Sequence, residues 1–317
     1  MSKSAVRPFS KEPEYLELNR QFVQRVIPHL QGLDCVVDLA CGTGTLTDLF
    51  LAELQNDTAS APTAVWPAGS PELTVIGLDL SLGSLKLAHD HFATLTSSSS
   101  TSTASLERQG TVRCLRPIFV KASGDRLPLA NAVANLVLLG NAIHCFTDKQ
   151  RLLEEVRRVL RPGGVFAFNS SFYAGSIVPG TEAFYQEWMK GALHYIKGRE
   201  EELRSSGKGG PLRKRGRGQP AFSNRWLTPL EFTQALKDHA FDVKHVTERR
   251  IGMLRHHFEG ASANTGGWEA ELATVLLSGY PVELACEALG SSVGPAFDTL
   301  GVESIPRSWL EVIAAKS

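Results

Sequence analysis

Short apolar runs alternate with amphipathic segments over the first half of this chain. Five of the runs have the length and residue types of buried strands, and the segments between them carry apolar residues at helical spacing. The expected strands are Cys35–Leu39, Leu73–Leu78, Pro117–Lys121, Ala134–Leu139 and Val165–Asn169. This alternation predicts a parallel sheet with helices on both of its faces.

The helical segments have recognisable boundaries. Helices are expected over residues 10–30, over 45–54, over a segment carrying Leu85, Ala88 and Phe92, and from Thr147 to about residue 161. Thr147 and Gln150 have the spacing of a capping box, and Pro162-Gly163-Gly164 is typical of a helix end. The serine- and threonine-rich stretch 96–105 is too polar to pack and should form a surface loop.

The second half departs from this simple alternation. A helix that Thr181 should cap carries two neighbouring apolar stripes, Phe184, Trp188 and Tyr195 in one and Tyr185, Met189, Leu193 and Ile196 in the other. A helix so broadly apolar must bury most of its surface, and one or two of its aromatic side chains are expected to face a pocket. The basic, glycine-rich run 207–218 is more typical of a solvated loop than of a phosphate-binding element.

Regular patterns resume after residue 226. Thr228 and Glu231 have capping-box spacing, with proline at the first helical position, and open a helix to Ala240. Strands are expected over Phe241–Val246 and over Ser308–Ala314. We expect one domain over residues 1–317, made of an N-terminal helical lid (1–32), a core (33–170), a cap insertion (171–225) and a C-terminal part (226–317) with a helical insertion (256–300).

Composition narrows the class of protein. The 317 residues are 43% hydrophobic and carry a formal net charge of +0, which argues against a basic nucleic-acid-binding face. The five cysteines form no C-x-x-C pair, so we expect reduced thiols and a cytoplasmic location. We see no secretion signal at the N-terminus and no apolar run long enough to span a membrane.

Glycines and acidic residues follow several of the expected strands. They include Asp38 with Gly42 and Gly44, then Asp79, then Gly124 with Asp125. The carboxyl ends of parallel strands meet in one crevice, so these residues should converge there. A dinucleotide fingerprint would require a third glycine where Thr47 stands, which weakens that alternative.

In order and chemistry, these stretches over residues 33–170 resemble the class I S-adenosylmethionine-dependent methyltransferases, in particular small-molecule enzymes with a methyltransferase-11-like domain. The resemblance implies a Rossmann-like, doubly wound α/β sheet of about seven strands, mostly parallel, with helical cap insertions. By the same resemblance, the last strand, Ser308–Ala314, is antiparallel and lies beside the sixth. It also implies S-adenosylmethionine as cofactor and S-adenosylhomocysteine as product. Ala40 and Asn135 depart from the family pattern, as does the long insertion 55–71.

The resemblance assigns the cofactor site residue by residue. Asp79 is placed to accept the ribose hydroxyls, Asp125 to face the adenine amino group, and Asn141 to contact the methionine end, while Asp38 adds negative charge nearby. The expected cofactor-binding residues are Asp38, Ala40, Gly42, Thr43, Gly44, Asp79, Leu80, Gly124, Asp125, Arg126 and Asn141. Bound in this way, the cofactor would be held by glycine backbone and carboxylates and would need no phosphate cradle.

Catalysis of methyl transfer rests mainly on alignment, and a general base is needed only where the acceptor must lose a proton. His144 and Tyr173 are the catalytic candidates, although His144 could equally hydrogen-bond backbone or shape the cofactor pocket. Phe172 and Tyr173 could stack on an acceptor. The His256-His257 pair has no third ligand at useful spacing, so no metal is expected.

These observations predict a methyltransferase acting on a small, hydrophobic acceptor such as a natural product, quinone, lipid or isoprenoid-like molecule. The apolar cap could alternatively form a homodimer interface. An RNA or protein methyltransferase is the first alternative, suggested by the basic run 207–218. A cofactor-binding protein without transferase activity is the second. We expect no nucleic-acid partner.

Overall fold

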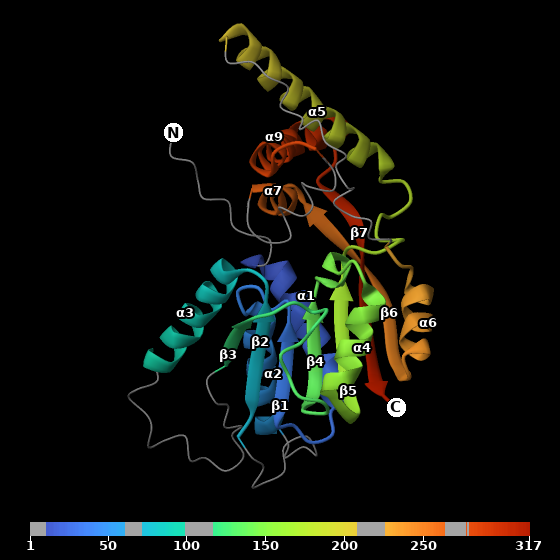
Figure 1. The fold of residues 1–317 in the computed structure, drawn as a ribbon. Coiled ribbons are helices and arrows are strands. Elements are labelled where there is room, and N and C mark those ends of the chain that lie inside the picture. Colours follow the sequence, from blue (N-terminus) through green and yellow to red (C-terminus); the bar gives the residue numbers. More distant parts are fainter. Residues whose placement is uncertain (1–10, 61–71, 99–116, 208–225, 264–276, 278) are drawn as a thin grey trace. The chain divides into compact units, whose positions relative to one another are not determined.

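The computed structural model describes residues 11–60, 72–98, 117–207, 226–263, 277 and 279–317. Within them, seven strands form one sheet in the order β3-β2-β1-β4-β5-β7-β6 (Figure 1). The strands are β1 Cys35–Leu39, β2 Thr74–Asp79, β3 Ile118–Lys121, β4 Ala134–Gly140, β5 Leu160–Ser170, β6 Phe241–Leu254 and β7 Ser304–Lys316. The pairs β1–β2, β1–β4, β2–β3 and β4–β5 are parallel, and β5–β7 is antiparallel. The predicted fold class is therefore confirmed.

Helices follow or precede most of these strands. They are α1 Pro13–Val26, η2 Ile27–His29, α2 Thr45–Ser60, α3 Leu82–Ser98, η3 Ile143–Cys145, α4 Lys149–Val159, α5 Glu182–Ser205, α6 Pro229–Asp238, α7 Arg255–Ala263 and α9 Val282–Leu300. Among the described residues, no helix has the length and apolar composition that crossing a bilayer requires.

The chain divides into two compact units. One comprises residues 13–173, 227–248 and 310–317, and the other comprises 1–12, 174–226 and 249–309. We call the first the core unit and the second the cap unit. The cap unit contains most of both predicted insertions, 171–225 and 256–300.

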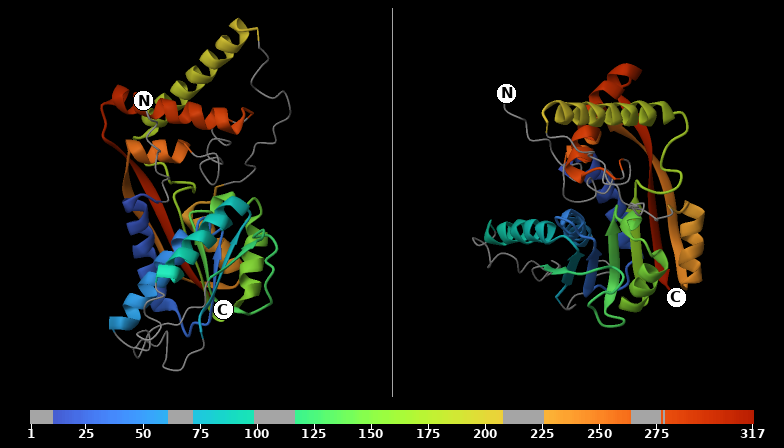
Figure 2. Two further views of the ribbon diagram at one scale, coloured as in Figure 1. Left: turned by 90° about the vertical axis from the view of Figure 1, so that its left-hand side faces the viewer. Right: turned by 45° about the horizontal axis from the view of Figure 1, so that its top comes forward.

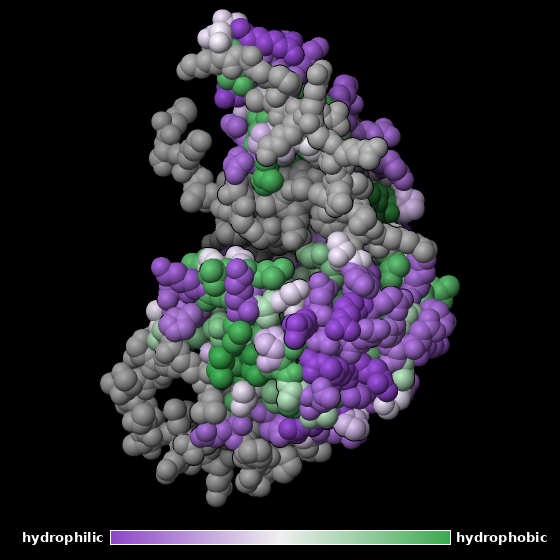
Figure 3. Space-filling model, in the orientation of Figure 1, coloured by the Kyte–Doolittle hydropathy of each residue, from purple (hydrophilic) through white to green (hydrophobic). Residues whose placement is uncertain are grey.

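Alternating side chains of the core-unit strands build two separate apolar layers. Val37, Leu39 and Val137 pack with α4 and α6, whereas Val36 and Leu138 pack with α1 and α2. This is the expected result of strand periodicity, because successive side chains point to opposite faces of a sheet. The outward side of α4 carries mostly hydrophilic side chains (Figure 3). Both faces of the parallel sheet are thus covered, as in other doubly wound sheets.

The cap unit is organised around aromatic side chains. Helices α5 and α9 contact one another, as do α7 and α9, and the C-terminal part of α5 extends beyond α9 (Figure 2). Phe184 lies 4.9 Å from both Phe258 and Phe297 between ring centroids, and Trp188 Nε1 donates to the carbonyl of Leu289 at 2.8 Å. These contacts bury the apolar stripe of α5 inside the cap unit itself.

Two predicted helix boundaries are wrong. The N-cap of α4 is Asp148, whose Oδ1 accepts from the backbone N–H of Arg151 at 2.9 Å, so Thr147 lies one residue too early. The helix ends at Val159, before the Pro162-Gly163-Gly164 turn, because Val133 N donates to Val159 O and Ala134 pairs with Leu160. Tertiary pairing with β4 therefore begins β5 earlier than the proline signal predicts.

Two further elements extend beyond their predicted ends, since α2 continues past residue 54 to Ser60 and β6 continues past Val246 to Leu254. The Thr228–Glu231 capping box is confirmed, with Glu231 N donating to Thr228 Oγ1 at 3.2 Å. Thr181 stands at the N-cap of α5, but its hydroxyl donates back to Val178 O at 2.7 Å and does not cap the helix. Helix α3 continues to Ser98, and the rest of the predicted loop 96–105 lies outside the described residues. Nearly all of the basic run 207–218 also lies outside them.

Candidate functional site

The carboxyl ends of β1, β2 and β4 bring the predicted cofactor residues together within the core unit. Asp38 pairs in register with Gly77 of β2 and with Leu138 of β4. The residues that follow these strands, from Ala40, Asp79 and Asn141 onward, must therefore leave the sheet at neighbouring points of one edge. This is the position at which open α/β sheets bind their ligands.

The loop after β1 turns in left-handed backbone conformations. The φ angles are 55° at Ala40, 55° at Gly42 and 79° at Gly44. Cys41 N donates to Leu78 O at 3.0 Å, which ties the loop to the end of β2. Ala40 pays about 1 kcal/mol for a conformation that glycine adopts freely. A glycine at this position would therefore relieve strain.

Asp79 is oriented by two backbone donors. Gly42 N donates to Asp79 Oδ2 at 2.9 Å, and Ser81 N donates to Asp79 Oδ1 at 2.7 Å. Each carboxylate oxygen has a second acceptor position, so both oxygens can still accept from a ligand hydroxyl. The neighbouring Leu80 side chain is 63% exposed and adds an apolar surface beside the carboxylate.

Asp38 is buried under the glycine loop, and burial raises its pKa to about 7. Thr47 Oγ1 donates to Asp38 Oδ2 at 2.6 Å, which opposes that rise, whereas the negative charge of Asp79 adds to it. Asp38 is thus partly protonated at neutral pH, so the negative charge expected there is incomplete. A cationic ligand beside it would favour the carboxylate form. The sequence shows Thr47 only as the position where a dinucleotide fingerprint would require a glycine. In the structure, its hydroxyl orients the Asp38 carboxyl group.

The raised pKa of Asp38 predicts a pH-dependent stability. The folded protein retains this proton between about pH 4 and pH 7, where the unfolded chain has lost it, so the contribution to stability is present at low pH and disappears as the pH rises through 7. Asp38→Asn removes that dependence and retains an acceptor for Thr47. We expect the free energy of unfolding of the wild type, relative to the variant, to fall by roughly 2 kcal/mol between about pH 5 and pH 8.

Denaturant unfolding of both proteins at the two pH values measures this difference. The Asp38→Asn variant is the reference for the wild type, because every other titrating group is common to the two proteins. Parallel pH profiles would show that Asp38 titrates normally, and they would contradict the assignment of a buried, protonated carboxyl group.

The turn after β3 holds Gly124, Asp125 and Arg126. Gly124 lies so close to Phe146 that an added Cβ would be 2.2 Å from the ring atom Cε1. Asp125 is exposed, and its backbone carbonyl accepts from Arg151 Nε at 3.1 Å. The packing on Phe146 and the bond to α4 fix the course of this turn. The Asp125 carboxylate accepts from Ser123 Oγ at 3.4 Å, and because it is exposed it can accept further hydrogen bonds from a ligand.

Asn141 ends β4 in a left-handed conformation with φ 47°. Its N–H donates to both the carbonyl and Oδ1 of Asn169, and its own Oδ1 accepts from Ser171 N at 2.8 Å. Asn169 and Ser171 are contributors that the sequence reasoning missed. No motif signals them, because their role depends on the pairing of β4 with β5.

The two catalytic candidates also lie in the core unit. His144 is 5% exposed, its ring centroid is 4.4 Å from that of Phe172, and its Nε2 is 3.5 Å from Cys145 Sγ. Tyr173 is 1% exposed and donates from its hydroxyl to Glu248 Oε1 at 2.7 Å. The catalytic roles of both residues stay predictions. Glu248 is the partner that any proton transfer at Tyr173 would have to involve.

The predicted histidine pair lies in the cap unit. His256 Nε2 is 3.7 Å from Glu12 Oε2, and ligand-type atoms of Glu12, His256 and His257 lie within 4.8 Å of one another. His257 Nδ1 accepts from Leu254 N at 3.1 Å, which occupies one of its two possible ligand atoms. The structure therefore brings Glu12 to the pair, a neighbour that sequence spacing does not reveal.

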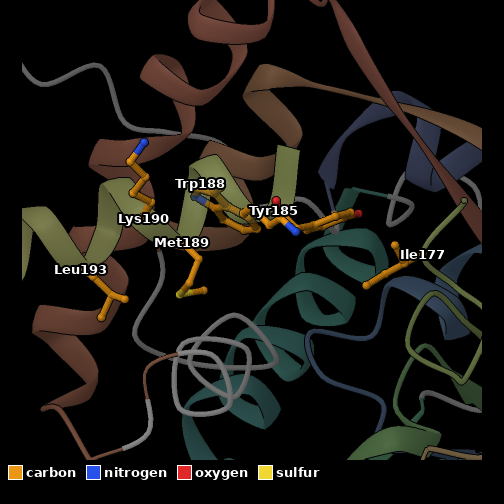
Figure 4. Close-up of a pocket in the computed structure, with 7 residues that line it drawn as sticks. Ile177, Tyr185, Trp188, Met189, Lys190 and Leu193 are labelled. Carbon is orange, nitrogen blue, oxygen red and sulfur yellow. The ribbon is translucent and has the colours of Figure 1, made fainter. Parts of the chain in front are cut away.

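A cavity of about 620 Å³ opens beside α5 in the cap unit (Figure 4). The residues that line it are Ile177, Tyr185, Gln186, Trp188, Met189, Lys190 and Leu193. Its walls are mainly apolar, and Tyr185 accepts from Arg307 Nη1 at 3.0 Å. The second predicted stripe of α5 thus lines this cavity, except that Ile196 is buried together with the first stripe. Tyr195 of the first stripe is only half-buried.

Comparison with known proteins gives a consistent assignment. Residues 37–168 match the family described as "Methyltransferase domain". Ubiquinone/menaquinone biosynthesis C-methyltransferase UbiE from Acidiphilium cryptum is 35% identical over 88 residues, which is 28% of this chain and 34% of that protein. Dimethylglycine N-methyltransferase from Parasynechococcus marenigrum is 38% identical over 177 residues, 56% of this chain and 49% of that protein.

These matches are partial, and the chain spans between a third and a half of the length of these two curated relatives. Among solved structures, the YcgJ protein from Bacillus subtilis superposes with a TM-score of 0.50 at 12% identity, over 95% of this chain and 98% of that one. At this identity the superposition bears on the fold alone.

Proposed function

Residues 37–168 belong to the methyltransferase domain family, and from this premise we propose that the chain transfers a methyl group from S-adenosylmethionine to a small, hydrophobic acceptor. The cofactor supplies a methyl carbon activated by a sulfonium, which bonds to the acceptor as its bond to sulfur breaks, leaving the electron pair on sulfur in S-adenosylhomocysteine. The protein's part is to bind, align and exclude water.

The geometry around Asp79 is the observation that carries this proposal. Its carboxylate is fixed by Gly42 N and Ser81 N, yet each oxygen can accept a further hydrogen bond. A pair of adjacent ribose hydroxyls fits two such oxygens. The same carboxylate ties down the glycine loop, so binding of the ribose and the position of the loop would depend on one another.

The other polar groups of the core unit fit the remaining parts of the cofactor. Asp38 lies beneath the glycine loop, where a sulfonium or ammonium group would draw it into its charged form. Asp125 is exposed on a fixed turn and can accept from an adenine amino group. This distribution of carboxylates suits a cationic nucleoside better than the pyrophosphate of a dinucleotide, which they would repel.

We assign proton removal, where the acceptor requires it, to His144. Its imidazole lies in the segment that follows β4 and packs on Phe172, and histidine is the side chain that most often acts as a general base. Tyr173 is the second candidate, through its hydrogen bond to Glu248.

The proposal that the acceptor is hydrophobic is supported by the cap unit. Its cavity of about 620 Å³ has the size of a small-molecule site and is lined by Ile177, Met189 and Leu193 among others. The names of the relatives cover different acceptors, since one is a quinone-biosynthesis C-methyltransferase and another a dimethylglycine N-methyltransferase. The proposal of a hydrophobic acceptor therefore rests on the cavity of this chain and not on the relatives.

Calorimetric titration of the purified protein with S-adenosylmethionine, S-adenosylhomocysteine and NAD tests the cofactor. We expect dissociation constants of the order of micromolar for the two sulfur compounds, about −8 kcal/mol, and no heat of binding with NAD. Binding of NAD with no response to either sulfur compound would overturn the proposal.

Transfer of a labelled methyl group then separates the acceptor classes. Quinones, isoprenoid alcohols and lipid phenols are offered beside bulk RNA and a protein extract. We expect label in an apolar small-molecule fraction. Label in RNA or protein would favour the first alternative function, and binding of cofactor with no transfer to any fraction would favour the non-catalytic one.

A further inference from the structure

Buried amide side chains connect helix α1 to the end of β5. Asn19 Nδ2 donates to the carbonyl of Tyr15 at 2.8 Å, one turn earlier in α1. Asn169 Nδ2 donates in turn to Asn19 Oδ1 at 2.9 Å. Asn19 is 1% exposed and Asn169 is fully buried. Both amides therefore have fixed orientations, because each nitrogen faces an oxygen.

The same series continues from β5 to the predicted cofactor site. Asn169 Oδ1 accepts from Asn141 N at 2.9 Å, and Asn141 Oδ1 accepts from both the N–H and the hydroxyl of Ser171. The oxygen of Asn141 is thus assigned by two donors, and its Nδ2 must point the other way. We call Asn19, Asn169, Asn141 and Ser171 the amide network; every residue of it lies in the core unit.

The network ends in a donor that the protein does not use. Asn141 is 4% exposed, and among the described residues its Nδ2 has no hydrogen-bond partner. A buried donor without an acceptor is costly, and such a donor in a folded protein calls for an explanation. The left-handed backbone of Asn141, with φ 47°, is one that asparagine tolerates, so the unpaired Nδ2 is the feature that suits a group kept for a ligand.

Charge identifies the part of the ligand that this donor suits. The proposed contacts to the ribose, the adenine and the cationic groups are all made by carboxylates, at Asp79, Asp125 and Asp38. The methionine carboxylate would be repelled by each of them and requires a donor. Asn141 Nδ2 can supply this donor. Asn141 directly follows β4, which lies in the sheet between β1, the strand of Asp38, and β5, the strand of Asn169.

We propose that Asn19 and Asn169 are positioning residues, which hold the amide of Asn141 so that its Nδ2 donates to the carboxylate of bound S-adenosylmethionine. Helix α1 thereby contributes to recognition of the methionine part through the amide network. This inference rests on the proposed function and deepens it, because it names which half of the cofactor depends on α1.

Asn19→Leu tests the network, because leucine has the same branching and number of side-chain heavy atoms as asparagine and offers no partner to Asn169. Two ligands are titrated, S-adenosylhomocysteine and methylthioadenosine, which has the same nucleoside but lacks the amino and carboxylate groups. We expect the dissociation constant of S-adenosylhomocysteine to rise about tenfold, as when one hydrogen bond to a charged group is lost. That of methylthioadenosine should change by less than about twofold.

Val26→Ala is the matched control. Val26 lies on the same helix, is fully buried and takes no part in the amide network. This variant should lower the melting temperature while leaving both dissociation constants within about twofold of the wild type. An equal loss of affinity for both ligands in Asn19→Leu, or no loss for either, would overturn the proposal.

Asn141→Asp decides the sign of the interaction and does not depend on the folding of the first variant. It keeps the oxygen that Ser171 recognises and replaces the donor by a second carboxylate oxygen. Repulsion of the ligand carboxylate should weaken S-adenosylhomocysteine more than about tenfold and leave methylthioadenosine unchanged. Tighter binding would identify the ligand's ammonium as the partner and refute the proposal. Failure of the wild type to bind either ligand would instead refute the proposed function.

Discussion

Asp79→Ala is expected to weaken binding of S-adenosylhomocysteine about a hundredfold without unfolding the protein. The substitution removes both oxygens that would accept the ribose hydroxyls. It also releases Gly42 N and Ser81 N, which now donate to Asp79 at 2.9 and 2.7 Å. Hydrogen bonds to charged groups contribute about 1.5–3 kcal/mol each, and two of them account for the expected loss.

Calorimetry measures the affinity, and thermal unfolding verifies the fold. Asp90→Ala serves as the matched control, because Asp90 is an exposed aspartate on the helix that follows Asp79. It should leave the affinity unchanged. Asp79→Asn retains the shape but faces a backbone N–H with an amide nitrogen, so it should also bind weakly. Wild-type affinity in a folded Asp79→Ala protein would show that Asp79 does not bind the ribose.

Gly124→Ala is expected to weaken cofactor binding about tenfold and to destabilise the protein by about 1–2 kcal/mol. The added Cβ would lie 2.2, 3.0 and 3.1 Å from three atoms of the Phe146 ring. Contacts this short cannot persist, so either the ring or the turn must move. Because Asp125 follows directly, movement of the turn displaces the carboxylate that we assign to the adenine amino group.

The double variant Gly124→Ala/Phe146→Leu distinguishes this clash from a requirement for glycine itself. Leucine removes the ring atoms that meet the new Cβ, so the affinity for S-adenosylhomocysteine should recover most of its loss. Gly198→Ala is the control, because nothing lies within 4 Å of a Cβ added at that position on α5. It should be neutral for binding. Lack of recovery in the double variant would assign the effect to the backbone of Gly124.

Much of the core-unit fold follows from local sequence. The limits of β1 agree with its apolar run, and the Thr228–Glu231 cap is present as its spacing predicts. The family resemblance implies an antiparallel last strand beside the sixth, and β7 lies between β5 and β6 and pairs antiparallel with β5. Errors occur where a long-range contact competes with a local signal: pairing of Ala134 with Leu160 ends α4 before Pro162 is reached.

The candidate site, like the fold, could be predicted from the sequence only in part. The sequence identifies Asp38, Asp79 and Asn141 because each lies at or next to the carboxyl end of a strand, and strand ends can be located from the apolar pattern. It does not show that Asp38 is buried enough to have a pKa of about 7, since that value depends on the packing above β1. Nor does it show that Thr47, nine residues away, donates to that carboxylate.

By itself, the sequence determined the class of fold, the positions of most strands and the glycine and carboxylate residues of the site, because these depend on periodicity and spacing along the chain. Only the tertiary structure decided which side chains orient those residues. Asn19 and Asn169 are 150 positions apart, and they meet because α1 packs over the sheet near the end of β5. No local pattern encodes such a contact, since it exists only after both apolar layers have formed.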